Sequence, residues 1–378
     1  MRFARIFALF IVTTFFTVST SVHAAENLDI GEVGAIMKQI ALENNYLARI
    51  QIPRTSPNPQ NQNEPFVNEI NSTGFLYRNN AGELRIVTVN HALGPTPTAT
   101  TIWVTFGNGF GKAEIVGRDP AADLALLKVP AWLTEGIEPA RFNFSDALRV
   151  GDVVFAAGFP HELKATTFGV VIALEQIPLP VQFPSWLYVT TQTPLNPGNS
   201  GGPLLNRNRE VVGINVSIVP LTAAVLNTPN GIAVVGGDGG GMSFSLNARI
   251  IGRLLARLER DKLVEHASFD FSIRETREVS PIMYEYYTEK DYPPPEEGVM
   301  VYEVFTDTAS ERAGLRMGDL LKEVRFAERR HVVTTRRALE EFIFFEVSPN
   351  TRGEVVVKRN DELVTIPISF MRLPPLRR

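Results

Sequence analysis

A serine enclosed by glycines is the strongest chemical signal in this sequence. Ser200 lies in the run Pro197-Gly198-Asn199-Ser200-Gly201-Gly202-Pro203. A serine hydroxyl is a weak nucleophile until a base takes its proton, and the oxyanion formed by its attack needs fixed hydrogen-bond donors. Glycines permit a tight turn that aims the N–H groups of Gly198 and Ser200 at one point. The run predicts a nucleophile with an oxyanion hole at Gly198, Asn199 and Ser200, and an ordinary glycine turn is the alternative.

His91 is the predicted general base. It ends the apolar strand Ile86–Asn90, and strand ends are where loops deliver catalytic groups. Only five histidines exist in the sequence, and His91 alone both follows a buried-looking strand and precedes Ser200. A structural histidine is the alternative at this position.

Asp123 is the predicted orienting acid. It directly precedes the apolar run Leu124–Val129, so its carboxylate is expected to be buried. Burial is costly unless the group accepts hydrogen bonds, and holding His91 in place would meet that need. A turn or capping aspartate is the alternative. Asp119 is the weaker candidate, because Asp-Pro favours a turn. The order His, Asp, Ser is one of the known triad orders.

No metal, nucleotide or organic cofactor is expected. The acids do not cluster with histidines at ligand spacing, and the glycine runs lack a phosphate-binding lysine in a strand-to-helix context. The sequence has no cysteine, which excludes disulfides, a cysteine nucleophile and thiolate metal sites. The net charge is -4, so no basic excess favours nucleic acid as a partner.

The first residues predict a secretory signal peptide over 1–24. Arg2 and Arg5 precede an uncharged run from Ile6 to Val22, and Val22-His23-Ala24 offers small residues at the cleavage positions. The alternative is a retained membrane anchor, since the uncharged run is about long enough to span a bilayer. Residues 25–65 are expected to hold a helix at Ile30–Asn45 and a loop or strap at Thr55–Pro65.

Two domains are expected after that segment. Residues 66–263 contain short apolar runs between turn residues, which predict an antiparallel barrel or sandwich closed by a helix at Ala248–Leu263. Tyr292-Pro293-Pro294-Pro295 ends a predicted linker over 264–295. Residues 296–372 are expected to form a small α+β unit of four strands and two helices, beginning with a strand at Val299–Val304 and including a helix at Arg336–Phe345.

The sequence resembles the HtrA (Deg) family of secreted trypsin-like serine proteases with a C-terminal PDZ domain. The resemblance is carried by Thr88–Ala92, Gly117–Val129, Thr193–Gly213 and, for the PDZ domain, Gly298–Val301 with Ala309–Asp319. It implies a mainly β fold, with a chymotrypsin-like double β-barrel followed by a small α+β PDZ-like domain. It further implies a homotrimer, a bacterial periplasmic location, and ATP-independent cleavage of misfolded or unfolded polypeptides. Three segments depart from the family: Gly158–Leu163, Val219–Gly241 and Phe326–Val332.

Three finer expectations concern recognition. The PDZ-like unit is expected to hold the terminal carboxylate of a bound peptide at Glu297-Gly298-Val299 and to pair the peptide with Met300–Val304. The pocket for the residue before the cleaved bond is expected to be small and apolar, with Val216 and Ile218 on its wall. The segment Val219–Ser245, with five glycines in Gly236–Gly241, is expected to be a loop that orders on activation, or else a surface turn without such a role.

Two other functions remain open from the sequence. One is a chaperone-like or scaffold protein in which the PDZ domain does the main task, although the presence of all three triad members favours an active enzyme. The other is a membrane-tethered signalling protease, which depends on whether the N-terminal segment is retained.

Overall fold

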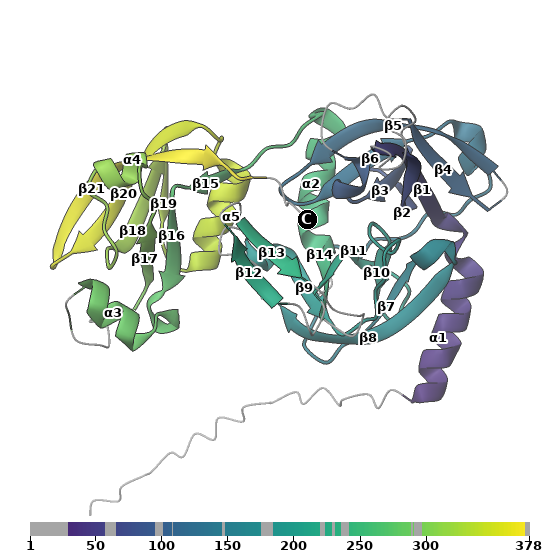
Figure 1. Ribbon diagram of the computed structural model, residues 1–378, viewed down its shortest axis with the longest axis horizontal. Coiled ribbons are helices and arrows are strands. Elements are labelled where there is room, and N and C mark those ends of the chain that lie inside the picture. Colours follow the sequence, from purple (N-terminus) through teal and green to yellow (C-terminus); the bar gives the residue numbers. More distant parts are fainter. Residues whose placement is uncertain are drawn as a thin grey trace, which may run out of the picture.

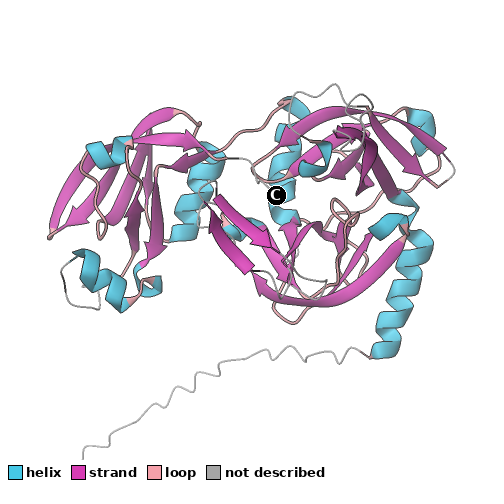
Figure 2. Cartoon of the chain, in the orientation of Figure 1, coloured by secondary structure: helices cyan, strands magenta, loops and turns pink. Residues whose placement is uncertain are grey.

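The computed structural model describes residues 29–56, 66–94, 101–107, 109–145, 148–174, 184–219, 224–228, 231–235, 242–288, 290 and 297–374. Strands dominate this part of the protein (Figure 2). The predicted signal peptide, most of the predicted strap and the glycine run Gly236–Gly241 lie outside the described residues. In the described ranges, no helix combines the length and the apolar character needed to cross a membrane.

The first barrel is a closed sheet of six strands in the order β1-β2-β3-β6-β5-β4. Its strands are β1 (Leu47–Ser56), β2 (Phe66–Arg78), β3 (Leu84–Thr88), β4 (Ile102–Phe106), β5 (Gly109–Asp119) and β6 (Leu124–Lys128). Large apolar side chains fill it, and those of Ile50, Phe75 and Ile86 have no exposed surface. Because closure leaves no free edge, the barrel gives a rigid frame for the loops at its ends.

The second barrel has six strands in the order β10-β11-β14-β9-β8-β7. They are β7 (Val153–Gly158), β8 (Ala165–Leu174), β9 (Tyr188–Thr191), β10 (Pro203–Leu205), β11 (Val211–Val219) and β14 (Met242–Asn247). The buried core includes Val154, Val189 and Leu204. The double-barrel architecture confirms the predicted fold class, and Figure 1 shows the two barrels side by side on the right.

Two helices cover the barrels. Helix α1 (Ile30–Glu43) confirms the predicted N-terminal helix and is tied to the β10–β11 turn by the Arg207–Glu32 ion pair at 2.7 Å and the Arg209–Glu43 ion pair at 3.0 Å. Helix α2 (Ala248–Arg260) begins at Asn247, whose side chain accepts a hydrogen bond from the Arg249 N–H at 2.9 Å. Its buried side consists of Ala248, Ile250, Ile251, Leu254, Leu255 and Leu258.

The described residues within Val219–Ser245 include regular secondary structure. The segment contains a hairpin of β12 (Ala224–Thr228) and β13 (Gly231–Val235), which form a two-stranded sheet of their own. Figure 1 draws this hairpin beyond β14, toward the second domain. The sequence did not predict it, because its apolar residues read as part of one glycine-rich loop.

The second domain is a seven-stranded sheet in the order β15-β21-β20-β18-β17-β16, with β19 paired to β18. Its strands are β15 (Ala267–Phe269), β16 (Phe271–Glu275), β17 (Val299–Val304), β18 (Leu320–Phe326), β19 (Arg329–Val332), β20 (Thr351–Arg359) and β21 (Glu362–Arg372). Its helices are α3 (Pro281–Thr288), α4 (Ala309–Arg312) and α5 (Arg336–Glu346). This is the predicted small α+β unit, on the left in Figure 1.

The domain boundary lies earlier than predicted. We expected a linker over 264–295, but β15 pairs with β21 and β16 pairs with β17 within the same sheet. The second domain therefore begins at Ala267 instead of residue 296. Strands of three and five residues that alternate Phe with Ser and Asp carry too little apolar pattern to stand out from a linker.

The two domains contact each other through α5. The ring of Phe344 stacks on His266 with centroids 3.5 Å apart and meets Trp186 edge-on at 5.5 Å. The Arg253 guanidinium of α2 lies 3.5 Å from the centre of the Phe345 ring and pairs with Glu341 at 3.0 Å. The C-terminal half of α5 thus packs against the barrels.

Candidate active site

His91 and Asp123 are brought together at the end of the first barrel. His91 begins a short 3₁₀ turn, η2 (His91–Leu93), just after β3. Its Nδ1 lies 2.7 Å from Asp123 Oδ2, and its backbone N–H donates to Asp123 Oδ1 at 2.7 Å. One carboxylate therefore fixes both the ring and the backbone of the histidine, although they lie 32 residues apart.

The backbone at Asp123 is unusual for a residue with a side chain. Its φ is +57°, in the left-handed region, and its side chain is 1% exposed. The carbonyl oxygen of Asp123 accepts a hydrogen bond from Asn90 N–H at 3.2 Å, and the preceding turn is held by an Ala122 N–H bond to Asp119 Oδ1 at 2.9 Å. Such strain persists only where the surroundings hold it, and it gathers at functional sites.

The turn around Ser200 requires glycines for two reasons: neighbouring backbone atoms leave no room for a Cβ, and two of the positions have positive φ values. A Cβ on Gly201 would lie 2.1 Å from the Thr73 carbonyl oxygen, and one on Gly202 would lie 2.2 Å from that of Ala157. Gly198 and Gly201 also have φ values of +104° and +86°. No other residue type fits at these positions without moving the backbone.

Strand β2 supports this turn from the first barrel. The Thr73 N–H and the Ser72 hydroxyl both donate to the Ser200 carbonyl oxygen, at 2.9 and 2.6 Å, and Thr73 Oγ1 donates to Gly198 O at 2.6 Å. Thr88 Oγ1 in turn donates to Thr73 O at 2.7 Å. These residues could not be predicted from the sequence, because Ser72 and Thr73 lie among other polar residues of β2 and nothing marks them out.

Two backbone N–H groups are available for an oxyanion. Pro197 O accepts a hydrogen bond from the His161 N–H at 3.1 Å, so the trans peptide directs the Gly198 N–H to the opposite side. Among the described residues, no acceptor is hydrogen-bonded to the Gly198 or Ser200 N–H. The Asn199 N–H is used, because it donates to Asn196 O at 3.0 Å. Of the three predicted oxyanion residues, Gly198 and Ser200 retain a free donor and Asn199 does not.

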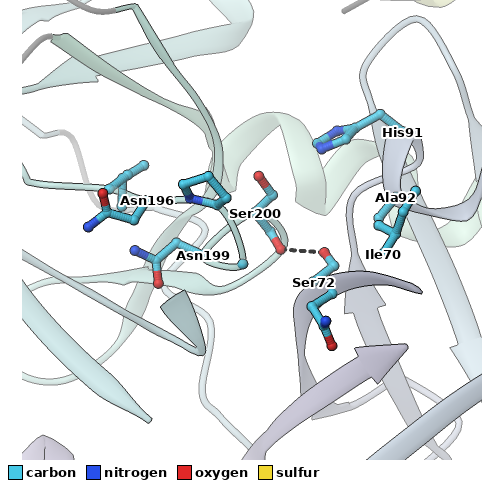
Figure 3. Close-up of a pocket in the computed structure, with 11 residues that line it drawn as sticks. Ile70, Ser72, His91, Ala92, Asn196, Asn199 and Ser200 are labelled. Carbon is cyan, nitrogen blue, oxygen red and sulfur yellow. Dashed lines mark hydrogen bonds between the residues drawn. The ribbon is translucent and has the colours of Figure 1, made fainter. Parts of the chain in front are cut away.

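A cleft of about 280 Å³ contains Ser200 and His91. Its lining is Ile70, Asn71, Ser72, His91, Ala92, Leu195, Asn196, Pro197, Gly198, Asn199 and Ser200. Figure 3 shows the His91 ring and the Ser200 side chain on facing walls, with the dashed bond joining Ser72 to Ser200. The Ser200 hydroxyl donates to Val216 O at 3.2 Å in this conformation. The two predicted chemical groups therefore share one opening.

The turn that holds Pro197 is itself strained. His161 and Glu162 have φ values of +46° and +68°, two successive left-handed residues without a glycine. The Glu162 carboxylate is paired with Arg49 at 3.1 Å and accepts from Asn71 Nδ2 at 3.4 Å. These bonds reach back to β1 and β2, so the turn is fixed to the first barrel.

The strand predicted to pair with a bound peptide in the second domain is not a free edge. Met300–Val304 belongs to β17, which pairs with β16 along its length and with β18 at Val299 and Met300. In Glu297-Gly298-Val299, the Gly298 N–H donates to Thr276 Oγ1 at 3.2 Å, and Val299 is 1% exposed in the core. In the described part of the sheet, β16 lies at one end of the strand order and pairs on one side only, with β17, and the short β15 lies at the other end.

The predicted specificity pocket is described in part. Val216 is buried behind Ser200, and Leu195 lines the cleft. The side chain of Ile218 lies outside the described residues. Within the described ranges, no group of three or more His, Cys, Asp or Glu side chains is placed to hold a metal ion.

Comparisons with known proteins agree with this geometry. Residues 72–214 match the family model of the trypsin-like peptidase domain. The "Probable periplasmic serine endoprotease DegP-like" of Chlamydia trachomatis is 30% identical over 310 residues, which are 81% of this chain and 54% of that protein. The chain thus spans about half the length of this relative. "Serine endoprotease DegS" of Haemophilus influenzae is 26% identical over 269 residues, covering 71% of this chain and 68% of that one.

A solved structure shares the fold. The "HtrA-type protease AlgW with decapeptide" superimposes with a TM-score of 0.62 at 20% sequence identity, over 90% of this chain and 99% of that one. The chain therefore contains a trypsin-like peptidase domain at residues 72–214 and is similar in sequence to DegP-like and DegS serine endoproteases, and it shares the fold of an HtrA-type protease.

Proposed function

We propose that this protein is a serine endopeptidase with Ser200 as nucleophile, His91 as general base and Asp123 as orienting carboxylate. The observation that carries the proposal is the 2.7 Å contact of His91 Nδ1 with a buried Asp123, in a cleft that also holds Ser200. This is the arrangement in which an imidazole can take a serine proton.

The first chemical step is attack on the peptide carbonyl. The Ser200 hydroxyl would turn away from Val216 O toward His91 Nε2, which takes its proton as the new C–O bond forms. Asp123 accepts a hydrogen bond from the His91 Nδ1–H group. This bond keeps His91 Nε2 unprotonated, so that Nε2 can act as the base. The carboxylate also stabilises the imidazolium that forms. The negative charge then develops on the former carbonyl oxygen.

Gly198 and Ser200 would stabilise that charge with their free N–H groups. His91 next gives its proton to the leaving amine, and the acyl group stays on Ser200. Water, deprotonated by His91, hydrolyses this ester and restores the hydroxyl. Each proton moves between Ser200, His91 and the substrate, so these steps require no further co-reactant.

The substrate class proposed is unfolded polypeptide. The cleft is open to solvent at its mouth, and its apolar side chains near the nucleophile, Leu195 and Ile70, suit a small apolar residue before the cleaved bond. No acid among the lining residues would receive a basic side chain. The DegP-like relative is described as a periplasmic endoprotease, which supports a periplasmic location.

The second domain is proposed to bind the C-termini of polypeptides along β16. An extended peptide could add to this edge strand beside α5, whose Leu339 and Ile343 are buried toward the core. The terminal carboxylate would lie at the bend between β15 and β16, at Asp270. The "HtrA-type protease AlgW with decapeptide" shares this fold, which is consistent with peptide binding by such a protein. A homotrimer remains a proposal that light scattering would test.

The proposal is tested by incubating the wild type and Ser200→Ala with reduced, unfolded casein. We expect cleavage by the wild type and a loss of several orders of magnitude in the variant, because removing a triad member leaves only the oxyanion hole and binding. A variant that retains more than about a tenth of the wild-type rate would exclude Ser200 as nucleophile.

A further inference from the structure

Arg118 lies buried beside the turn that carries His91. It is the penultimate residue of β5, and 4% of its surface is exposed. Its Nε donates to Asn90 Oδ1 at 2.7 Å, while its Nη2 lies 2.5 Å from Gly94 O and 3.4 Å from Asn90 O. Asn90 precedes the His91–Leu93 turn and Gly94 follows it. One guanidinium therefore bonds to both ends of the turn.

We propose that Arg118 is a positioning residue for the triad, which holds the His91 turn through its planar fork and sets the local charge around His91 and Asp123. This inference rests on the proposed function and extends it. A guanidinium presents donors in fixed directions, so it can bond two carbonyls and an amide oxygen at once. The ammonium group of a lysine carries its donors on one nitrogen, so it cannot bond to both ends of the His91 turn at once.

The backbone of Arg118 is fixed from the other side. Its N–H donates to Lys262 O at 3.1 Å, and its carbonyl accepts from the Val264 N–H at 2.8 Å. The segment after α2 thus anchors the strand end from which the side chain reaches the His91 turn. Because hydrogen bonds fix both the backbone and the side chain of Arg118, its guanidinium cannot move far, and it holds the His91 turn in one position.

The charge of Arg118 acts on the same groups. Burial lowers the pKa of Arg118, and the negative charge of Asp123 opposes that change, so the two groups interact. The guanidinium therefore attracts the Asp123 carboxylate and repels any positive charge that forms on the imidazole during the reaction. The other titratable pair at this strand end is Asp119 with His266, whose Oδ2 and Nε2 lie 2.7 Å apart with both side chains fully buried.

Two substitutions of Arg118 separate the effect of the guanidinium geometry from the effect of its positive charge. Arg118→Lys keeps a cation and loses the fork, whereas Arg118→Met loses both. The Asp119–His266 pair is unchanged in each variant. The rate at which diisopropyl fluorophosphate inactivates the enzyme reports the reactivity of Ser200 without peptide binding, and kcat and KM for a casein-derived peptide report turnover.

We expect Arg118→Lys to lower kcat and the inactivation rate about tenfold at every pH with KM unchanged, because His91 is less well placed. Arg118→Met should lose at least as much and should also move the acid limb of both pH profiles to higher pH, because a positive charge beside the catalytic groups is lost. A role in folding alone would lower the melting temperature without moving that limb.

Arg359 supplies the matched control. In the second domain it also forms a fork, with Nε and Nη2 2.6 Å from the two Asp319 oxygens and Nη2 2.7 Å from Gly314 O. Arg359→Lys and Arg359→Met should destabilise that domain and leave the inactivation profile in place. Wild-type kcat in Arg118→Lys, or an unmoved acid limb in Arg118→Met, would overturn the inference.

Ser200→Ala is measured in parallel to separate the two levels of the account. If the wild type reacts no faster than Ser200→Ala, the proposed function fails and the role of Arg118 falls with it. If the wild type depends on Ser200 while the Arg118 variants match it, only the inference about Arg118 fails.

Discussion

The backbone N–H of His161 donates a 3.1 Å hydrogen bond to the carbonyl oxygen of Pro197, so the trans peptide directs the following Gly198 N–H away from His161. The donor comes from a turn with two left-handed residues, and Glu162 in that turn is paired with Arg49 of β1. The turn that carries the proposed oxyanion donors is thus supported by contacts that join the two barrels.

The His161 amide can be removed selectively. Proline at residue 161 has no N–H and cannot adopt the observed φ of +46°, so His161→Pro should free the Pro197 carbonyl and lower kcat by about a hundredfold, with a smaller effect on KM. His161→Gly keeps the N–H and suits the left-handed backbone, so it should retain wild-type kcat. Equal activity in the two variants, measured with a peptide substrate, would show that this amide does not arrange the oxyanion donors.

The role of Asp123 can be tested without changing its size. Asp123→Asn presents an amide to His91 Nδ1 and favours the tautomer that lacks a free Nε2 base, so kcat should fall by about 10⁴ near neutral pH. The melting temperature should change far less than kcat. A loss below about tenfold would assign Asp123 to the turn alone.

The glycines of the nucleophile turn should be sensitive to the space around them. Gly201→Ala places a Cβ 2.1 Å from Thr73 O, whereas Gly82→Ala has a similar φ of +83° and no atom within 4 Å. Both variants share the backbone penalty of about 1 kcal/mol, and only Gly201→Ala adds a clash with backbone atoms. We expect a clearly lower melting temperature and a loss of activity for Gly201→Ala, against a small stability change for Gly82→Ala. Matching melting curves would mean that the turn relaxes at little cost.

Glu340 should make the contact between the domains depend on pH. Burial raises its pKa from 4.5 to about 7, a net value that includes the opposing charge of Arg336 and the reinforcing charge of Glu278. Between these two pH values the folded state keeps a proton that the unfolded state has released, so stability falls as the pH rises through this window.

Glu340→Gln cannot ionise, so its melting temperature should match the wild type near pH 4.5 and exceed it by about 3 °C at pH 8. Glu341→Gln is the control on the same helix. It removes the 3.0 Å ion pair with Arg253 and should not stabilise the protein at pH 8. A Glu340→Gln difference that is constant across the pH range would contradict the ionisation of Glu340 as its cause.

The sequence predicted those features whose cause is local. The glycine run around Ser200 and the aspartate before the buried strand β6 are recognisable because a tight turn and a buried carboxylate each need those residue types in place. The strands β4, β7 and β11 were found because their apolar runs end at turn residues. Helix α2 was found from its single apolar side.

Features that depend on the topology could not be predicted. Thr73 supports Gly198 across 125 residues, and nothing in Ser72-Thr73 reveals that partner. The edge position of β16 is a property of the strand order, so the sequence placed the peptide beside β17, which is an interior strand. The domain boundary moved for the same reason, because β15 and β16 are strands only through their pairing with β21 and β17.

The most direct measurement is the position of a covalent adduct after reaction with diisopropyl fluorophosphate, located by mass spectrometry of proteolytic fragments. The account predicts one adduct on Ser200 in the wild type, and labelling slower by several orders of magnitude in His91→Ala, which lacks the base. An unlabelled wild type, an adduct on another residue, or equal labelling in His91→Ala would contradict the proposed catalytic role of Ser200 and His91.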